Sequence, residues 1–310
     1  MLAKCADGPT RSRRGPVVPS SPPAVKTLIV NADDFGLSRE VNAAVVKAHR
    51  EGILTSASLM VAEAHRDEAV SLAREHPALD VGLHAVVCRG RSVLRPAEIA
   101  PAVDALGRFP DNPVRTGLRW YFDKQLRGKL EAELRAQVEK HLELVGYLNH
   151  IDGHLNFHVH PVVADILVEL ASEYKVPCLR VPRERVLTTL RLRRDHAVRK
   201  AVEAAIFRAL SSRTRRLMRK RGLKSTDSLF GLHQSGHLDE DYIVAIIDRL
   251  REGATELYFH PALDIGDTPP SASAQVEVEI LTSPRVRDAL VARGVRLASF
   301  AELARGGARA

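Results

Sequence analysis

Short apolar runs alternate with amphipathic stretches from residue 25 almost to the end of this 310-residue chain. The runs are rich in Val, Ile and Leu and predict buried strands, whereas the stretches between them carry apolar residues at helical spacing. About seven strand–helix repeats of this kind predict an α/β fold whose parallel sheet closes, or nearly closes, into a TIM-like (β/α) barrel. We therefore expect a single domain over residues 26–305, built as a distorted barrel of seven strands.

The expected elements can be given by residue range. The strands are expected at 26–34, 55–61, 79–87, 148–154, 176–184, 254–262 and 295–300, and the helices at 38–52, 64–77, 130–146, 162–174, 239–253 and 283–294. Ser38 is expected to cap the first helix, because its side chain can accept a hydrogen bond from the first turn. Gly52 and Gly146 are expected to end helices.

Residues 1–25 differ from the rest of the chain. They are rich in Pro, Ser and Arg and lack apolar periodicity, so we expect a disordered basic tail. This tail lacks the apolar core of a signal peptide, and no apolar run in the chain approaches the roughly 20 residues needed to cross a bilayer. The three cysteines are scattered, as is usual in a reducing compartment. We therefore expect a cytoplasmic protein.

Chemically capable side chains stand at the ends of four predicted strands: the stretch 31–34 with Asp33 and Asp34, His84, the stretch 150–154, and His260. The carboxyl ends of the strands of a parallel barrel meet on one face, so these groups are expected to line one pocket. Asp and His side chains that arrive from separate strands can form a metal site with open coordination positions. A cation there would also relieve the repulsion between the adjacent carboxylates, and leave one of them to act as a base.

Each of these motifs taken alone has a simpler explanation. An Asp pair is most often a turn or a helix cap, and a lone His84 or His260 can simply end a strand. His150, His154 and His158 could form a stripe on a helix, although the nearby Gly and Pro disfavour a helix at this place. The occurrence of all four motifs at strand ends favours a shared metal site.

In combination, the stretches "VNADDFGLS", "VGLH", "HIDGH" and "ELYFHPA" resemble the YdjC-like carbohydrate deacetylases, and the resemblance extends over residues 26–303. It implies one divalent metal ion, Zn²⁺ or Mg²⁺, bound by Asp34, His84 and His154. It also implies roles in the reaction for four further residues: Asp33 as the general base, His260 as the general acid, Arg180 as a residue that orients Asp33 or contacts substrate, and Asn31 as a substrate contact.

Residues 81–122 look most similar to the hopanoid-biosynthesis-associated branch of that family, HpnK. This resemblance implies removal of the N-acetyl group from an N-acetylglucosamine-type sugar on a hopanoid glycolipid. A chito-oligosaccharide deacetylase, a metal-dependent phosphoesterase and a non-catalytic lipid- or sugar-binding protein are the alternatives. A phosphoesterase would favour a two-metal cluster with more carboxylates than the motifs supply. The sequence makes no prediction of the oligomeric state.

The positive charge of the chain is concentrated in residues 183–224. This segment has fifteen Arg and Lys against three acidic residues, a net charge of +12, whereas the whole chain has +8. Its apolar residues are spaced as in one or two helices, so we expect a basic helical insert in the barrel domain. It could be a solvated helix packed on the barrel, a peripheral contact with the anionic inner face of the membrane, or a nucleic-acid site. Because no stacking aromatics accompany the charge, we expect no nucleic-acid partner.

Overall fold

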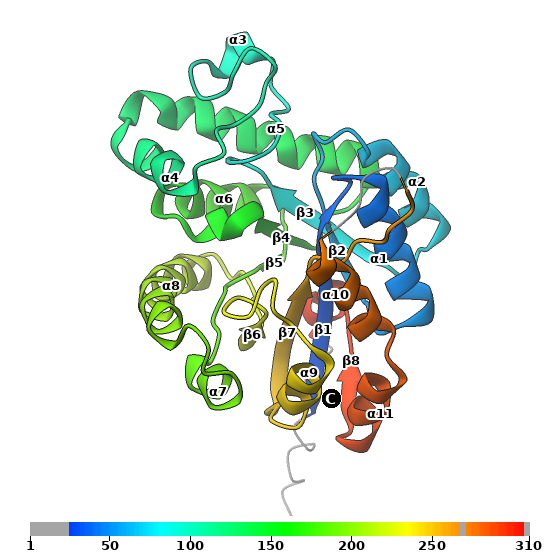
Figure 1. Ribbon diagram of the computed structural model, residues 1–310. Coiled ribbons are helices and arrows are strands. Elements are labelled where there is room, and N and C mark those ends of the chain that lie inside the picture. Colours follow the sequence, from blue (N-terminus) through cyan, green and yellow to red (C-terminus); the bar gives the residue numbers. More distant parts are fainter. Residues whose placement is uncertain (1–24, 267–270, 307–310) are drawn as a thin grey trace, which may run out of the picture.

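The structure is a computed structural model that describes residues 25–266 and 271–306. This described part contains an eight-stranded sheet in which all strand pairs are parallel (Figure 1). The strands are β1 (Lys26–Phe35), β2 (Ser56–Leu59), β3 (Asp80–Ala85), β4 (His150–Gly153), β5 (Cys178–Leu179), β6 (Ser228–Phe230), β7 (Gly253–Phe259) and β8 (Val295–Leu297). The tail predicted at 1–25 lies, except for Val25, outside the described residues.

The first strand of the chain lies in the middle of the sheet. Seven strands follow the order β5-β4-β3-β2-β1-β7-β6, and β8 pairs with β1 off this path. Residues 28–32 of β1 have no exposed surface, which explains the continuous apolar run that predicted this strand, since both faces of a parallel sheet are covered. The seven strands form a curled half-barrel, so the predicted seven-stranded, distorted (β/α) barrel is confirmed.

β5 and β6 are the two edge strands of the half-barrel, and we call the boundary between them the seam. In the described residues, one isolated bridge between Cys178 and Lys224 stands in this seam. The backbone N–H of Leu179 donates to the carbonyl of Lys224 at 3.0 Å, and the N–H of Leu229 donates to the carbonyl of Arg183 at 3.2 Å. The two edge strands of the half-barrel are thus bridged by the chain that connects β5 to β6 and not by a regular strand pair.

Helices cover the outside of the sheet (Figure 1). They are α1 (Arg39–Glu51), α2 (Arg66–Glu75), α3 (Pro96–Ile99), α4 (Pro113–Phe122), α5 (Arg127–Val145), α6 (Pro161–Glu173), α7 (Val186–Leu192), α8 (Ala197–Lys220), α9 (Glu240–Ile247), α10 (Ala272–Thr282), α11 (Pro284–Ala292) and α12 (Phe300–Ala304), with the 3₁₀ helices η1 (Lys124–Leu126) and η2 (His154–Val159). None of the described helices combines the length and the apolar character needed to cross a membrane.

The helix ends predicted at Ser38, Gly52 and Gly146 are confirmed, whereas the helix predicted over 239–253 ends at Ile247 and several elements were missed. The Ser38 side chain accepts a hydrogen bond from the N–H of Val41, and Gly146 ends α5 in the left-handed conformation. The sequence analysis missed β6, because a run of three residues gives no periodicity to read. It also missed α4 and α10 and extended the last strand to residue 300, where Ser299 instead caps α12 through a capping box. The segment 183–224 holds the two helices α7 and α8, as the spacing allowed.

Burial of His141 gives the fold a dependence on pH. His141 lies on the buried face of α5, which packs against β3, and burial together with the nearby His150 lowers its pKa to about 3. An unfolded chain binds this proton near pH 6.5, so the unfolded state holds more protons between these values and the free energy of unfolding falls as the pH drops below 6.5. At pH 5 the loss from this one group is about 2 kcal/mol.

We expect His141→Leu to remove this part of the pH dependence. The free energy of unfolding of the natural chain and of the variant is measured in urea at pH 8 and at pH 5. The quantity compared is the difference between the two free energies for each protein. The exposed His237, replaced by Leu, serves as the control and should leave the difference unchanged. An equal loss of stability between pH 8 and pH 5 in His141→Leu and the natural chain would contradict this explanation.

Candidate active site

An irregularity at the end of β1 brings two neighbouring carboxylates to the same site. In a regular strand Asp33 and Asp34 would point to opposite faces. Here the pairing of β1 with β2 shifts register between Ala32 and Phe35, and Asp34 takes a left-handed conformation with φ of 65°. Such an irregularity re-aims a side chain. The Asp33 side chain is therefore buried inside the half-barrel, whereas Asp34 lies at the edge formed by the carboxyl ends of the strands, here called the rim. Both residues line one cavity.

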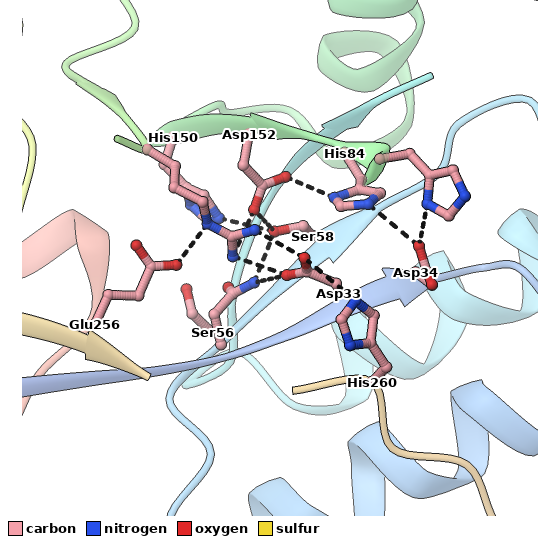
Figure 2. A network of polar contacts seen from close by, with 12 residues as sticks. Asp33, Asp34, Ser56, Ser58, His84, His150, Asp152, Glu256 and His260 are labelled. Atoms are coloured by element: carbon pink, nitrogen blue, oxygen red, sulfur yellow. Dashed lines mark hydrogen bonds and ion pairs between the residues drawn. The ribbon is translucent and has the colours of Figure 1, made fainter. Parts of the chain in front are cut away.

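Asp34, His84 and His154 come together at this rim, as the resemblance implied. The Asp34 Oδ1 atom lies 3.2 Å from His84 Nε2 and 2.9 Å from His154 Nδ1, and the ligand atoms all lie within 4.8 Å of one another. The contacts of Asp34 are drawn in Figure 2. Ligands that bind one ion at about 2.0–2.2 Å lie roughly 3 Å apart around it. The three side chains are therefore close enough to share an ion.

The chemistry of His84 fits a metal ligand. Its ring is buried, and its Nδ1 lies 2.7 Å from Asp152 Oδ1. This contact holds a proton on Nδ1 and leaves Nε2 turned toward Asp34 Oδ1, 3.2 Å away. Burial alone would lower the pKa of His84, but the charges of Asp152 and Asp33 outweigh it and raise this pKa to about 10. The position thus favours a positive charge, which a bound cation supplies as well as a proton does.

Asp34 itself stays ionised. Burial opposes its charge, but the hydrogen bonds and charges of His154 and His84 outweigh burial and hold its pKa well below the ordinary range. An ionised carboxylate and two imidazole nitrogens form a donor set that suits several divalent ions.

A fully buried arginine lies beneath the metal-ligand group. Arg180 donates to both oxygens of Asp33 at 2.7 and 2.8 Å, and its Nε donates to Glu256 Oε1 at 2.7 Å. Its Nη2 also lies 2.8 Å from Asp152 Oδ2. Burial opposes the charge of Asp152, but Arg180 and His84 lower its pKa. Burial raises the pKa of Glu256 to about 7 in spite of Arg180.

Arg180 also explains how the chain tolerates the two adjacent carboxylates of Asp33 and Asp34. A metal ion alone was predicted to relieve the repulsion between them. In the structure Arg180 neutralises Asp33 from below, and the two histidines lie around Asp34. Each carboxylate therefore has its own positive partner.

Arg180 and Asn31 were predicted to contact substrate, with orientation of Asp33 as the other role for Arg180. Both side chains are fully buried. Asn31 Nδ2 donates to Asp33 Oδ1 and to Ser58 Oγ, both at 2.9 Å. Since neither residue reaches the surface and both hold Asp33, these contacts favour a positioning role over contact with substrate.

Asp33 and His260 face a cavity of about 300 Å³ that Asp34 also lines. The His260 Nε2 atom lies 3.9 Å from Asp33 Oδ2, and the His260 side chain is 38% exposed. Its backbone N–H donates to Glu277 Oε2 at 2.5 Å, which fixes the chain at the end of β7. The predicted base and the predicted acid are thus neighbours, and both can be reached from the cavity.

A second group of possible ligands, formed by Asp33, His84 and Asp152, lies deeper. The guanidinium of Arg180 already contacts both of its carboxylates. A second cation would have to stand beside this buried positive charge, which low-dielectric surroundings make costly. The rim group, formed by Asp34, His84 and His154, is therefore the better metal site.

No role was predicted for Asp152, Ser58 or Glu256. Asp152 shares a strand face with His150, because side chains two apart point the same way, and this spacing was the available signal. Ser58 Oγ donates to Asp152 Oδ2 at 2.6 Å. Glu256 is an acid within an apolar strand run, and a buried acid of this kind requires a partner.

Gly82 leaves the room that the neighbouring His150 occupies. A Cβ atom at this glycine would lie 2.3 Å from His150 Cε1. The His150 ring stacks on Phe300, with ring centroids 3.9 Å apart, so it has no space to retreat. His158, the third histidine of the considered stripe, is buried, and burial and Arg180 lower its pKa to about 4. Neither histidine belongs to the rim group.

Comparison with known proteins gives one family and several relatives. A model of the family described as YdjC-like protein matches residues 27–292. A carbohydrate deacetylase of Geobacillus stearothermophilus is 31% identical over 280 residues, which cover 88% of this chain and 96% of the relative. One of Brevibacillus brevis is 43% identical over 150 residues, 48% of this chain and 57% of the relative. A chitooligosaccharide deacetylase of Salmonella paratyphi B is 28% identical over 292 residues, 90% of this chain and 99% of the relative.

Among solved structures, a protein of Enterococcus faecalis V583 named for a proposed role in cellobiose-phosphate cleavage has a similar fold. The TM-score is 0.71, at 23% sequence identity, and the match covers 90% of this chain and 99% of that protein. A likeness at this identity shows a shared fold and carries no statement about activity.

Proposed function

We propose, since this chain belongs to the YdjC-like protein family, that it is a metal-dependent hydrolase that removes the N-acetyl group from an amino sugar. The observation that carries this proposal is that possible ligand atoms of Asp34, His84 and His154 lie within 4.8 Å of one another, with Asp33 and His260 on a cavity that Asp34 also lines. The names of the Geobacillus and Salmonella relatives support the reaction class.

The residues of this chain have separable roles in the proposed reaction. A divalent ion held by the rim group would supply Lewis-acid activation of water and of the amide carbonyl. Asp33, which Arg180 and Asn31 hold in place, accepts a proton from the attacking water. His260 donates a proton to the departing nitrogen. The amide C–N bond breaks, and the products are acetate and a free amine. Of the two ions expected, zinc accepts imidazole nitrogen more readily than magnesium, which prefers oxygen ligands.

The finer substrate proposal is an N-acetylglucosamine unit on a hopanoid glycolipid, handled at the cytoplasmic face of the membrane. Its support is the resemblance of residues 81–122 to the hopanoid-associated branch. A chito-oligosaccharide is the second candidate, and the name of the Salmonella relative favours it. A phosphoesterase with two metal ions has less support, because Arg180 already contacts the two carboxylates of the deeper group.

The test is to incubate the protein with N-acetylated chito-oligosaccharides, with a hopanoid extract that contains N-acetylglucosaminyl lipids, and with p-nitrophenyl phosphate. Mass spectrometry should detect loss of one acetyl group from a sugar substrate, with one acetate released for each new amine. Loss of acetyl from the lipid alone would support the hopanoid substrate. Phosphate release without acetate release would contradict the deacetylase proposal, and product from none of the three would contradict enzymatic function on these classes.

A further inference from the structure

A large groove lies between α7 and α8, apart from the cavity at Asp33. Its volume is about 1060 Å³. Both helices belong to the connection between β5 and β6 and lie along one side of the molecule (Figure 1). Among the described residues, seven arginines line this groove, whereas Glu184 is the one acid that does so. The groove therefore concentrates the positive charge that the sequence places in residues 183–224.

This charge is not neutralised within the described part of the chain. The side chains of Arg183, Arg215 and Arg219 form no ion pair there, and Glu184 is half-buried and accepts hydrogen bonds from Thr189 Oγ1 and from two backbone N–H groups. Burial and the charges of Arg183 and Arg219 lower the pKa of Arg215, and Asp227 offsets this only in part. The groove thus holds like charges close together.

Other arginines of the same segment differ in this respect. Arg193 pairs with Asp239, Arg213 with Asp165, and Arg221 with Glu169. The structure therefore separates the basic segment into arginines that pair with acids of the barrel domain and arginines that face the groove without an acidic partner. An anion in the groove would complete the charge balance of the second set.

The groove also has apolar walls. Val186, Leu190 and Phe207 line it together with alanines of α8. Leu187, at its edge, is 68% exposed. These surfaces favour a ligand that has an apolar part beside its anionic part over a free phosphate ion.

Apolar side chains continue from the groove over the outer face of α8. Val198, Val202 and Ile206 follow one another at intervals of four residues and are 80%, 55% and 53% exposed. An exposed apolar stripe beside basic residues on one helix is typical of a helix that lies in the interface of an anionic membrane. Apart from Phe207 and the buried His233, no aromatic side chain lines the groove among the described residues, so stacking of nucleic-acid bases has little support.

We propose that this groove binds an anionic lipid at a membrane surface, with the lipid head group among Arg183, Arg215 and Arg219 and its acyl chain against the apolar wall. The stripe on α8 then enters the interface between head groups and acyl chains. The occupant is an anionic phospholipid of the membrane, and the binding does not depend on catalysis.

The position of the groove has a consequence for the substrate. Arg183 follows Arg180 by three residues, and α8 packs against η2, which carries the metal-ligand candidate His154. The helix that forms one wall of the groove therefore also contacts the segment that carries a metal-ligand candidate. We extend the proposal, which here rests on the proposed function, to an amino sugar that is presented on a lipid.

The test is flotation of the full-length protein with phosphatidylcholine vesicles, with and without phosphatidylglycerol. The natural chain should float only with the anionic vesicles. The triple variant Arg183→Gln, Arg215→Gln, Arg219→Gln should lose about a hundredfold in vesicle affinity, since each basic side chain near an anionic surface contributes roughly fivefold. Circular dichroism verifies that the variant is folded.

A second triple variant removes the same charge outside the groove. Arg50, Arg127 and Arg305 lie outside residues 183–224, are exposed and do not line the groove, and their replacement by Gln should cost less than a tenth as much affinity. The basic residues before residue 25 are present in every variant and so cancel in the comparison. Leu187→Ser should weaken flotation, whereas Val291→Ser, at an exposed apolar position on α11, should not.

Three outcomes would overturn the proposal. The first is no flotation of the natural chain with anionic vesicles at low salt. The second is an equal loss in the two triple variants, which would indicate general attraction by charge. The third is binding of single-stranded RNA, without binding of lipid, that depends on the three groove arginines. Acetate release from a soluble oligosaccharide is measured in parallel, so a failure of the deacetylase proposal and a failure of the lipid site are distinguished.

Discussion

Replacement of His84 or His154 by Ala is expected to remove the bound metal ion and to reduce deacetylation to the background rate. The two imidazoles are two of the three proposed metal ligands, with nitrogens 3.2 and 2.9 Å from Asp34 Oδ1. Loss of a group that only orients a ligand costs roughly 10–100-fold in metal affinity, and loss of the ligand itself should cost more. Metal content after dialysis, measured by mass spectrometry, should fall from about one ion per chain to background.

The control for these variants is His160→Ala. His160 belongs to the same histidine-rich stretch, but its Nε2 contacts the carbonyl of Gly117 at 3.0 Å, and it is not in the rim group. This variant should keep both metal and activity. Retention of metal and of acetate release by His84→Ala and by His154→Ala would show that the ion is bound elsewhere or is not needed. Far-ultraviolet circular dichroism of all three variants separates loss of metal from loss of fold.

Replacement of Asp33 by Asn is expected to lower kcat by roughly 10²–10⁴-fold, the usual contribution of a general base, and to leave the metal ion bound. An amide of the same shape cannot accept the proton of the attacking water. The rim ligands keep their places, because Asp33 is not one of them. Arg180 keeps its contacts with Asp152 and Glu256, which limits the structural damage.

The measurement is acetate release at saturating substrate together with metal content. Asp34→Asn is the matched comparison, since the neighbouring carboxylate undergoes the same chemical change but is expected to lose metal as well. Unchanged turnover in Asp33→Asn would exclude Asp33 as the base. Loss of metal in both variants would instead place Asp33 among the ligands.

The metal-ligand candidates could be predicted from sequence because each stands at the end of a different strand. Asp34, His84 and His154 are separated by fifty to seventy residues in the sequence, and parallel topology alone brings such positions to one rim. The irregularity that turns Asp34 toward the rim could not be predicted, since it depends on the pairing of β1 with β2. The sequence therefore indicated the ligands but not the backbone that aims them.

The network of buried charged residues that holds Asp33 in place was harder to predict. Arg180 was predicted to orient Asp33 or to contact substrate, but its place between three carboxylates that come from β1, β4 and β7 was not predicted. Such a network depends on which side chains share the sheet interior, and local patterns do not contain that information. The basic segment shows the same limit, because its helices were visible in the spacing while the pairing of Arg213 and Arg221 with acids of α6 was not.

The seam between β5 and β6 has a consequence for the evolution of this scaffold. The ligand candidates Asp34 and His84 stand on β1 and β3, away from that seam, whereas His154 lies on η2, which packs against α8. Because few strand hydrogen bonds cross the seam, the part of the connection that neither carries Arg180 nor contacts η2 can lengthen, shorten or change its charge at little mechanical cost to these candidates. A lineage could thus adapt where its enzyme docks while it inherits the chemistry unaltered.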